Sequence, residues 1–303
     1  MVKKVIYSTI IIVTLVITLI YNQPISIYIA DLLDNQNKGV IPISNSFKRN
    51  YEFSYIKNVD DYSPYSYNEL LNVIYSILNN GWYSFSFYCP TEYTNCIKDI
   101  KSITENNEIL THINNFVHPY NSFSNIITSI SSSGEILLDI EKVYTDSQIN
   151  EINLMVDQIL KNEVDDEDII EDKLKSIHDY IINNTNYDTD AVENKSNFFS
   201  NTAYGSLIQG HAICSGYADA MALFLNYYDL PNYKISSDTH VWNAVKINNV
   251  WYHLDVTWDD QIDFSGNEKL IHKFFLINTN NLNKYAETDH QFDSTIYQEY
   301  QYN

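Results

Sequence analysis

Hydrophobic and polar positions divide the chain into parts with different patterns. Residues 5–21 carry no charge and are mostly Ile, Val, Leu and Thr. This length lies within the range of about 17–25 residues over which an apolar helix spans a bilayer. Residues 23–65 are polar and irregular, and we interpret them as a stalk. Helical and strand patterns alternate through the rest of the chain.

Residues 66–160 have the pattern of a small α+β unit. Apolar residues recur at helical spacing over 67–78 and over 97–115. Polar and apolar residues alternate over 81–87 and 134–140, as they do in strands with one buried face. These segments predict an N-terminal domain of mixed helices and strands.

Residues 161–303 are predicted to form a second, larger domain. Helical spacing over 146–160 leads into it, and a further helix is predicted over 166–183. The acidic run from Asp165 to Asp168 stands where this helix starts, and carboxylates there compensate the helix dipole. We interpret the run as a solvated face, not as a metal site. Residues 184–205 are polar and are predicted to form a loop.

A helix followed by a hairpin is predicted in the middle of this domain. Apolar residues of 215–230 share one helical face, and Pro231 ends the helix. Residues 240–247 and 250–256 have strand patterns and are joined by Asn248-Asn249. Asparagine tolerates the positive φ angles that a two-residue turn requires. The chain as a whole is therefore predicted to have an α+β fold.

The residues on either side of the apolar segment predict how the chain is placed in a membrane. Lys3 and Lys4 precede the apolar segment and indicate a cytoplasmic N-terminus with the body of the chain outside. No small-x-small cleavage pattern follows at Tyr21-Asn22-Gln23-Pro24, so we expect residues 1–22 to be an uncleaved single-pass anchor. Secretion after signal-peptide cleavage is the alternative.

The net charge excludes one class of partner. Eighteen Lys and Arg against 39 Asp and Glu give a formal charge of −21, which argues against nucleic-acid binding.

Cys89 and Cys96 are close enough in sequence for a disulfide in an oxidising compartment, which would leave Cys214 as the odd thiol. Two buried free cysteines are the alternative. Their spacing does not match a zinc-binding Cys-x2-Cys pair.

Cys214, His240 and Asp255 supply the residue types of a thiolate nucleophile with an oriented base. Cys214 immediately precedes the predicted helix over 215–230. Unpaired N–H groups and the helix dipole favour a thiolate at that position. The candidate chemistry is therefore nucleophilic attack by sulfur.

The hairpin would bring the imidazole and the carboxylate together. A turn at Asn248-Asn249 places His240 opposite Thr257 and Asp255 opposite Trp242. Both candidates then point to the same face as diagonal neighbours, roughly 7–8 Å apart at the backbone. A shift of one residue in the register would separate them.

Each residue also has an ordinary structural interpretation. A cysteine before an apolar helix is often a buried hydrophobe, and a histidine that opens a strand is often structural. The placement of all three residues together favours a thiol site. His211 and His253 are competing bases. We expect His211 to point elsewhere, and His253 shares the face of His240 but lies farther into the hairpin.

These residues resemble the bacterial transglutaminase-like superfamily, and the resemblance covers about residues 165–295. The segments that carry it are Ile177-His178-Asp179-Tyr180-Ile181, Asn184-Thr185-Asn186-Tyr187-Asp188, Ala203-Tyr204-Gly205, Cys214-Ser215-Gly216-Tyr217-Ala218, His240-Val241-Trp242-Asn243 and Trp251-Tyr252-His253-Leu254-Asp255-Val256-Thr257-Trp258-Asp259. Residues 60–160 resemble the extra N-terminal unit of some Gram-positive members.

The resemblance implies a papain-like core in which the helix carrying Cys214 packs on an antiparallel sheet. It implies attack by Cys214 on an amide of a protein or peptide, with His240 as base and Asp255 orienting it. The acyl-thioester then passes to water or to an amine. Gln209 is a candidate oxyanion donor beside the Cys214 N–H. No metal or organic cofactor is needed.

Two other functions remain open. The domain can be a catalytically idle binding or scaffold module at the cell surface. Alternatively, the N-terminal region recognises wall or peptide ligands and the thiol domain is ancillary.

Overall fold

The computed structural model describes residues 41–131, 134–262, 268–285 and 287–298. The described residues from Ser44 onward form one compact unit. The predicted membrane anchor over residues 1–22 lies outside the described residues. None of the helices in the described part of the chain is long and apolar enough to span a bilayer.

The polar segment before the first described helix packs into the core. Phe53 and Ile56 are 2% and 0% exposed. The buried Arg49 guanidinium donates to the backbone carbonyls of Phe116 (3.0 Å) and Asn232 (2.8 Å). The interpretation of residues 23–65 as a stalk is therefore wrong for residues 44–65. Widely spaced apolar side chains anchor this segment even though its overall composition is polar.

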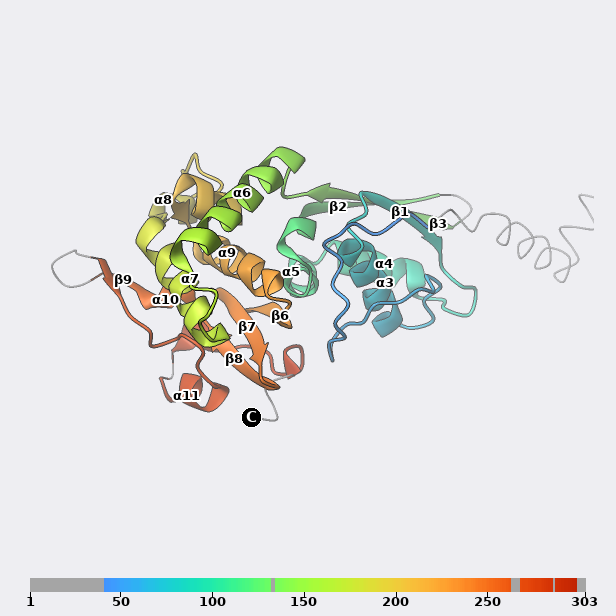
Figure 1. The fold of residues 1–303 in the computed structure, drawn as a ribbon. Coiled ribbons are helices and arrows are strands. Elements are labelled where there is room, and N and C mark those ends of the chain that lie inside the picture. Colours follow the sequence, from blue (N-terminus) through green and yellow to red (C-terminus); the bar gives the residue numbers. More distant parts are fainter. Residues whose placement is uncertain (1–40, 132–133, 263–267, 286, 299–303) are drawn as a thin grey trace, which may run out of the picture. The chain divides into compact units, whose positions relative to one another are not determined.

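Helices and a three-stranded sheet follow, as Figure 1 shows. They are α3 (Tyr67–Asn79), β1 (Ser84–Tyr88), α4 (Cys96–Thr104), α5 (Asn107–Asn115), η1 (Pro119–Asn121), β2 (Phe123–Ile130) and β3 (Glu135–Lys142). The sheet is antiparallel in the order β1-β3-β2. The single helix predicted over 97–115 is in fact two. Asn106 separates them, because its side chain accepts a hydrogen bond from the Ile109 N–H (3.1 Å) and caps α5.

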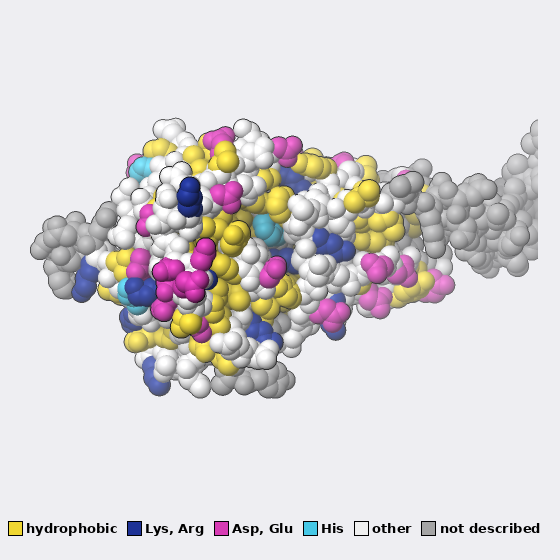
Figure 2. Space-filling view, in the orientation of Figure 1, with side chains coloured by type: hydrophobic (Ala, Val, Ile, Leu, Met, Phe, Trp, Pro, Cys, Tyr) yellow, Lys and Arg dark blue, Asp and Glu magenta, His cyan; other side chains and the backbone are white. Residues whose placement is uncertain are grey.

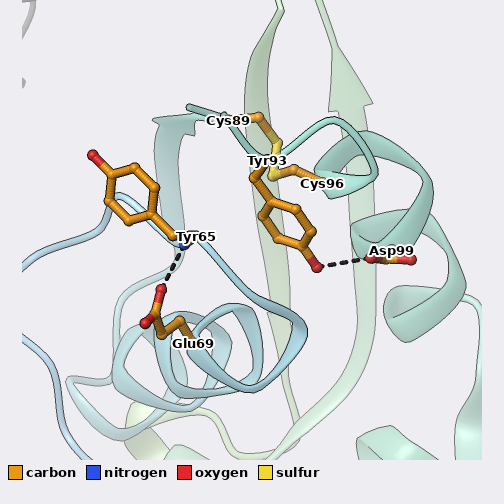
Figure 3. Close-up of a disulfide and its surroundings, with 6 residues drawn as sticks. All are labelled: Tyr65, Glu69, Cys89, Tyr93, Cys96 and Asp99. Carbon is orange, nitrogen blue, oxygen red and sulfur yellow. Dashed lines mark hydrogen bonds between the residues drawn. A yellow bond between two sulfur atoms is a disulfide. The ribbon is translucent and has the colours of Figure 1, made fainter. Parts of the chain in front are cut away.

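A disulfide joins the residue just after β1 to the first residue of α4. Figure 3 shows Cys89 and Cys96 bonded, with their Cα atoms 5.8 Å apart. Beside them the Tyr93 hydroxyl donates to Asp99 Oδ2 (2.7 Å), which holds the loop against α4. Cys96 is fully buried, so the disulfide fixes the loop to the core.

The rest of the chain builds a second sheet covered by helices. Its longer elements are α6 (Asp146–Glu163), α7 (Ile170–Asn184), α9 (Cys214–Tyr227), β6 (Asn232–Ser236), β7 (Val241–Ile247) and β8 (Val250–Leu254). Its shorter elements are β4 (Asn186–Tyr187), α8 (Thr189–Val192), η2 (Gly205–Gln209), β5 (His211–Ala212), α10 (Val256–Asp259), β9 (Asp260–Ile262), β10 (Glu268–Leu270), α11 (Thr279–Lys284) and η3 (Thr288–His290). Helix α9 packs on β7, and α7 packs on α9 (Figure 1).

The antiparallel sheet β6-β7-β8 separates two hydrophobic clusters. Val245 and Leu254 lie in the cluster that contains the apolar side chains of α7 and α9. Trp242 and Ala244, on the opposite face, lie in a cluster with residues of α3, α4 and α5. The second cluster contains residues from both sides of the predicted domain boundary at residue 160.

The acidic run before α7 is exposed to solvent. Asp165, Asp166, Glu167 and Asp168 each have an exposed side chain. Acidic side chains gather over the part of the surface where Figure 1 draws α7 (Figure 2). This exposure fits the interpretation of the run as a solvated face.

Candidate active site

Cys214 is the first residue of α9, and its side chain is partly exposed. The N-cap residue, Ile213, provides no side-chain hydrogen bond to the first turn. The N–H groups of that turn and the positive end of the helix dipole therefore face the region of the sulfur. Among the described residues Cys214 is the one cysteine outside a disulfide.

The chain just before α9 is held by close backbone contacts. The N–H of Ile213 donates to the carbonyl of Ser200 (2.8 Å). A Cβ atom at Gly216 would lie 2.4 Å from that same carbonyl oxygen, so only glycine allows the loop to approach so closely. The buried Asp188 carboxylate accepts hydrogen bonds from the hydroxyls of Ser196 and Ser200. These contacts fix the position of Cys214.

The hairpin beside the other two candidates has the predicted register. Ile247 lies opposite Val250, and Asn248 and Asn249 have φ angles of 51° and 66°. Both strands are shorter than predicted, and β7 begins at Val241, just after His240. Strand β8 ends at Leu254, and Asp255 becomes the N-cap of α10 because its Oδ1 accepts from the Trp258 N–H (3.1 Å).

His240 and Asp255 are in direct contact. His240 Nε2 lies 2.6 Å from Asp255 Oδ2, and the two residues are 8% and 1% exposed. Burial lowers the pKa of His240, but the charge and hydrogen bond of the Asp255 carboxylate, with a smaller contribution from Cys214, outweigh burial and raise this pKa above its ordinary value. The structure thus places His240 in a buried hydrogen bond with Asp255.

A second histidine, which the sequence analysis missed, contacts the same carboxylate. His290 Nε2 lies 2.8 Å from Asp255 Oδ2, and His290 is 4% exposed. Burial acts to raise the pKa of Asp255, yet His240 and His290 together hold it well below its usual range. His290 lies in the short turn η3, 35 residues after Asp255, and no motif or periodicity marks it.

The two competing bases have other partners. The ring of His211 stacks on Phe198 with ring centroids 4.0 Å apart. His253 Nδ1 accepts a hydrogen bond from the Trp242 indole (3.0 Å), and burial lowers the pKa of His253 to about 3. His253 is therefore a neutral, structural histidine.

Gln209, the candidate oxyanion donor, is held at its carbonyl end. Its Oε1 accepts a hydrogen bond from the Phe199 N–H (2.8 Å). That contact ties the last residue of η2 to the loop that packs against the start of α9. An oxyanion would need the other end of this amide, Nε2, as donor.

Within the described part of the chain, two groups of side chains offer ligand atoms within 4.8 Å of one another. They are His178, Asp179 and His272, and His240, Asp255 and His290. Two ligand atoms of a tetrahedral zinc ion lie about 3.3 Å apart, given zinc–nitrogen bonds of about 2.0 Å. The shortest separations here are 2.7 Å in the first group and 2.6 Å in the second. These are hydrogen-bond distances.

Comparisons with known proteins give one family match and several structural neighbours. A search of curated proteins finds no match. A solved structure described as a TGase is 16% identical, with a TM-score of 0.34, over 45% of this chain and 44% of that one. A candidate cysteine protease from Cytophaga hutchinsonii is 12% identical, with a TM-score of 0.28, over 45% of this chain and 62% of that one.

A candidate protease from Parabacteroides distasonis is also 12% identical, with a TM-score of 0.25, over 50% of this chain and 41% of that one. The chain therefore spans about half the length of these structures. Residues 155–256 match the model of the family described as the transglutaminase-like superfamily. The matched range includes Cys214, His240 and Asp255, so the chain contains a transglutaminase-like domain around the site described above.

Proposed function

We propose that the protein is a thiol-dependent enzyme that acts on amide bonds of proteins or peptides. One observation carries this proposal: the buried His240 ring contacts the Asp255 carboxylate through Nε2 at 2.6 Å, while Cys214 at the start of α9 contributes to the raised pKa of His240. Because Nε2 faces the carboxylate, Nδ1 is the ring nitrogen left for the sulfur. The transglutaminase-like domain supports the same general activity.

The first half of the reaction forms an acyl-enzyme. Nδ1 of His240 takes the thiol proton, and the Cys214 sulfur attacks the amide carbonyl carbon. The N–H of Cys214 at the start of α9, with Gln209 as a second donor, would stabilise the oxyanion. When the C–N bond breaks, the proton on Nδ1 passes to the leaving amine. The product is a thioester on Cys214.

The second half releases the acyl group. Water or an amine gives a proton to Nδ1 of His240 and attacks the thioester carbonyl, and the C–S bond breaks to regenerate the thiolate. Asp255 keeps the imidazole in the tautomer with the proton on Nε2 throughout. Water as acceptor makes the protein a peptidase or amidase, and an amine makes it a crosslinking transferase.

Alkylation of Cys214 tests the proposal. Iodoacetamide at pH 6 should label Cys214 rapidly in the folded protein, since a thiolate paired with an imidazolium reacts where an ordinary thiol does not. His240→Ala should slow labelling by about tenfold or more. If Cys214 labels only with the pH dependence of an ordinary thiol, a catalytically idle binding or scaffold module becomes the better interpretation.

The acyl acceptor is tested separately. The protein is incubated with a glutamine-containing peptide and a labelled amine, and both ammonia release and amine incorporation are measured. Ammonia with incorporation indicates a transferase, and ammonia alone indicates a hydrolase. Cys214→Ala is the matched control and should give neither product.

We also propose that the protein is anchored in the cell membrane by residues 1–22, with its body outside the cytoplasm. The disulfide between Cys89 and Cys96 supports an oxidising compartment. Cell fractionation should place the protein in the membrane fraction, and release into the medium would indicate signal-peptide cleavage instead. Cytoplasmic protein with three alkylatable thiols would contradict the proposal.

A further inference from the structure

Asp255 receives three hydrogen bonds, and two of them fall on one oxygen. Oδ2 lies 2.6 Å from His240 Nε2 and 2.8 Å from His290 Nε2. Oδ1 accepts from the Trp258 N–H at 3.1 Å. The carboxylate is 1% exposed, so these donors replace the water that would otherwise solvate its charge.

The second ring nitrogen of His290 indicates which nitrogen donates to Asp255. His290 Nδ1 is buried and has no hydrogen-bond partner among the described residues. A proton there would be an unsatisfied buried donor. Nε2 is therefore the ring nitrogen that carries the proton toward Asp255, and it donates to Oδ2.

Aromatic packing holds His290 in this orientation. Its ring stacks on Phe274 with centroids 4.8 Å apart and an interplanar angle of 22°. Trp258 and Trp242 lie at 4.9 Å and 5.1 Å. A ring fixed in this way can act on Asp255 only through its Nε2–H.

We propose that His290 is a positioning residue for the thiol site: it fixes the Asp255 carboxylate and shares the charge of Oδ2 with His240. This inference depends on the proposed function. Without His290, Oδ2 interacts with His240 alone. Its full negative charge then stabilises the His240 imidazolium, which releases its proton less readily. The carboxylate also loses one of the contacts that set its orientation.

Other titratable groups near Asp255 have different partners. Cys214 acts on His240, whose pKa it helps to raise. His253 is neutral and engaged with Trp242. Asp259 lies 3.2 Å from His178, and the charges of Asp259 and Asp255 repel each other. A change at His290 therefore acts on His240 through Asp255.

The test compares three variants of the full chain by the pH dependence of Cys214 alkylation and of kcat. His290→Phe keeps the aromatic ring and removes the donor, and His290→Gln keeps an N–H donor of similar reach. His118→Phe is the matched control, because His118 is also buried and stacks on an aromatic ring, that of Phe47. We expect His290→Phe to lower kcat about tenfold or more with little change in KM.

His290→Phe should also move the upper limb of the pH profile to higher pH by roughly half a unit or more. His290→Gln should restore most of the rate, and His118→Phe should change neither quantity. If Cys214 is activated but its pH profile of alkylation is the same in wild type and in His290→Phe, the role of His290 is overturned and the proposed function stands. If Cys214 of the wild-type protein has the pH profile of an ordinary thiol, the proposed function is overturned, and the role of His290 with it.

A measurement on the wild-type protein covers the case in which His290→Phe does not fold. Nitrogen-15 chemical shifts of the histidine rings should show a proton on Nε2 of His290, the nitrogen that donates to Asp255. A ring that carries its proton on Nδ1 and not on Nε2 would overturn the inference without any substitution.

Discussion

The side chain of Asn243 donates a hydrogen bond from Nδ2 to the backbone carbonyl of Ala218, at 2.9 Å. Asn243 lies in β7, three residues after His240, and Ala218 lies in α9, four residues after Cys214. The bond joins the strand that leads from the imidazole to the helix that carries the thiol. Asn243 is 1% exposed, so water does not compete for this contact.

Replacing Asn243 with Ala should therefore reduce the reactivity of Cys214 more than it reduces the stability of the fold. The loss of one buried hydrogen bond costs about 1–2 kcal/mol of unfolding free energy. Any shift of β7 against α9 also moves His240 relative to Cys214, and we expect the alkylation rate at pH 6 to fall about tenfold. Asn226→Ala is the control, because Asn226 makes the same kind of bond to Ala222 farther along α9 (2.7 Å). Equal losses of alkylation in both variants would contradict the prediction.

The sequence predicted these parts of the site because local signals specify them. Asn248-Asn249 fixed the hairpin register, since both residues adopt the positive φ angles of a two-residue turn. The boundary of the apolar stretch placed Cys214 at the start of its helix. The hairpin register predicted the proximity of His240 and Asp255.

The errors of prediction concern contacts that are distant in sequence. Residues 44–65 looked like a stalk because their few apolar side chains find partners only in the folded core. His290 was missed because its turn has no periodicity, and its contact with Asp255 depends on packing against Trp242 and Trp258. The break between α4 and α5 was missed because the apolar spacing continues across the Asn106 cap.

Asp255→Asn should strongly reduce activity while the fold remains. An amide can present a donor to His240 Nε2, which would then favour the tautomer with its proton on Nδ1 and remove the base that faces Cys214. We expect kcat to fall by about 10³-fold or more, in line with the loss of the orienting carboxylate in other triads. The measurement is steady-state kinetics, with circular dichroism to confirm the fold. A decrease of less than tenfold would show that Asp255 does not orient His240.

Gly216→Ala should disturb the start of α9. The new Cβ would lie 2.4 Å from the Ser200 carbonyl oxygen and 2.9 Å from that of Thr202. Backbone atoms cannot rotate away, so the loop or the helix must shift, at a cost of about 1–3 kcal/mol. Urea denaturation should show this loss, whereas Ser215→Ala at the neighbouring position should stay within about 0.5 kcal/mol of wild type. If Gly216→Ala is as stable as wild type, the loop moves to accommodate the new Cβ atom without a measurable loss of unfolding free energy.

Removing the disulfide should lower stability and leave the thiol site intact. The disulfide closes a loop with a sequence separation of 7, for which the chain-entropy estimate is about 2.5 kcal/mol. Alanine at both Cys89 and Cys96 avoids placing a hydroxyl at the buried Cys96 position. The unfolding free energy should fall by about 2 kcal/mol, while alkylation of Cys214 keeps its rate and pH dependence. A parallel loss of alkylation would show that the two regions are coupled.

His178 should make stability depend on pH above neutrality. Its ring is buried between two carboxylates, with Nδ1 2.9 Å from Asp179 and Nε2 3.2 Å from Asp259. Burial lowers the pKa of His178, but the charges of both carboxylates and the hydrogen bond with Asp179 outweigh burial and raise it. A raised histidine pKa adds stability that is complete below the unfolded value of about 6.5 and is lost as pH rises through the folded value.

The free energy of unfolding should therefore fall between pH 6 and pH 9. His240 also has a raised pKa and contributes to this pH dependence of stability. The test is therefore the difference in stability between wild type and His178→Gln, not the pH dependence of the wild type alone. The glutamine variant loses the titrating group, and the gap in stability between it and wild type should narrow as pH rises. Each pH unit by which the pKa is raised corresponds to about 1.4 kcal/mol. A gap that stays constant from pH 6 to pH 9 would mean that His178 is neutral in the folded protein and that its partners do not hold a proton on it.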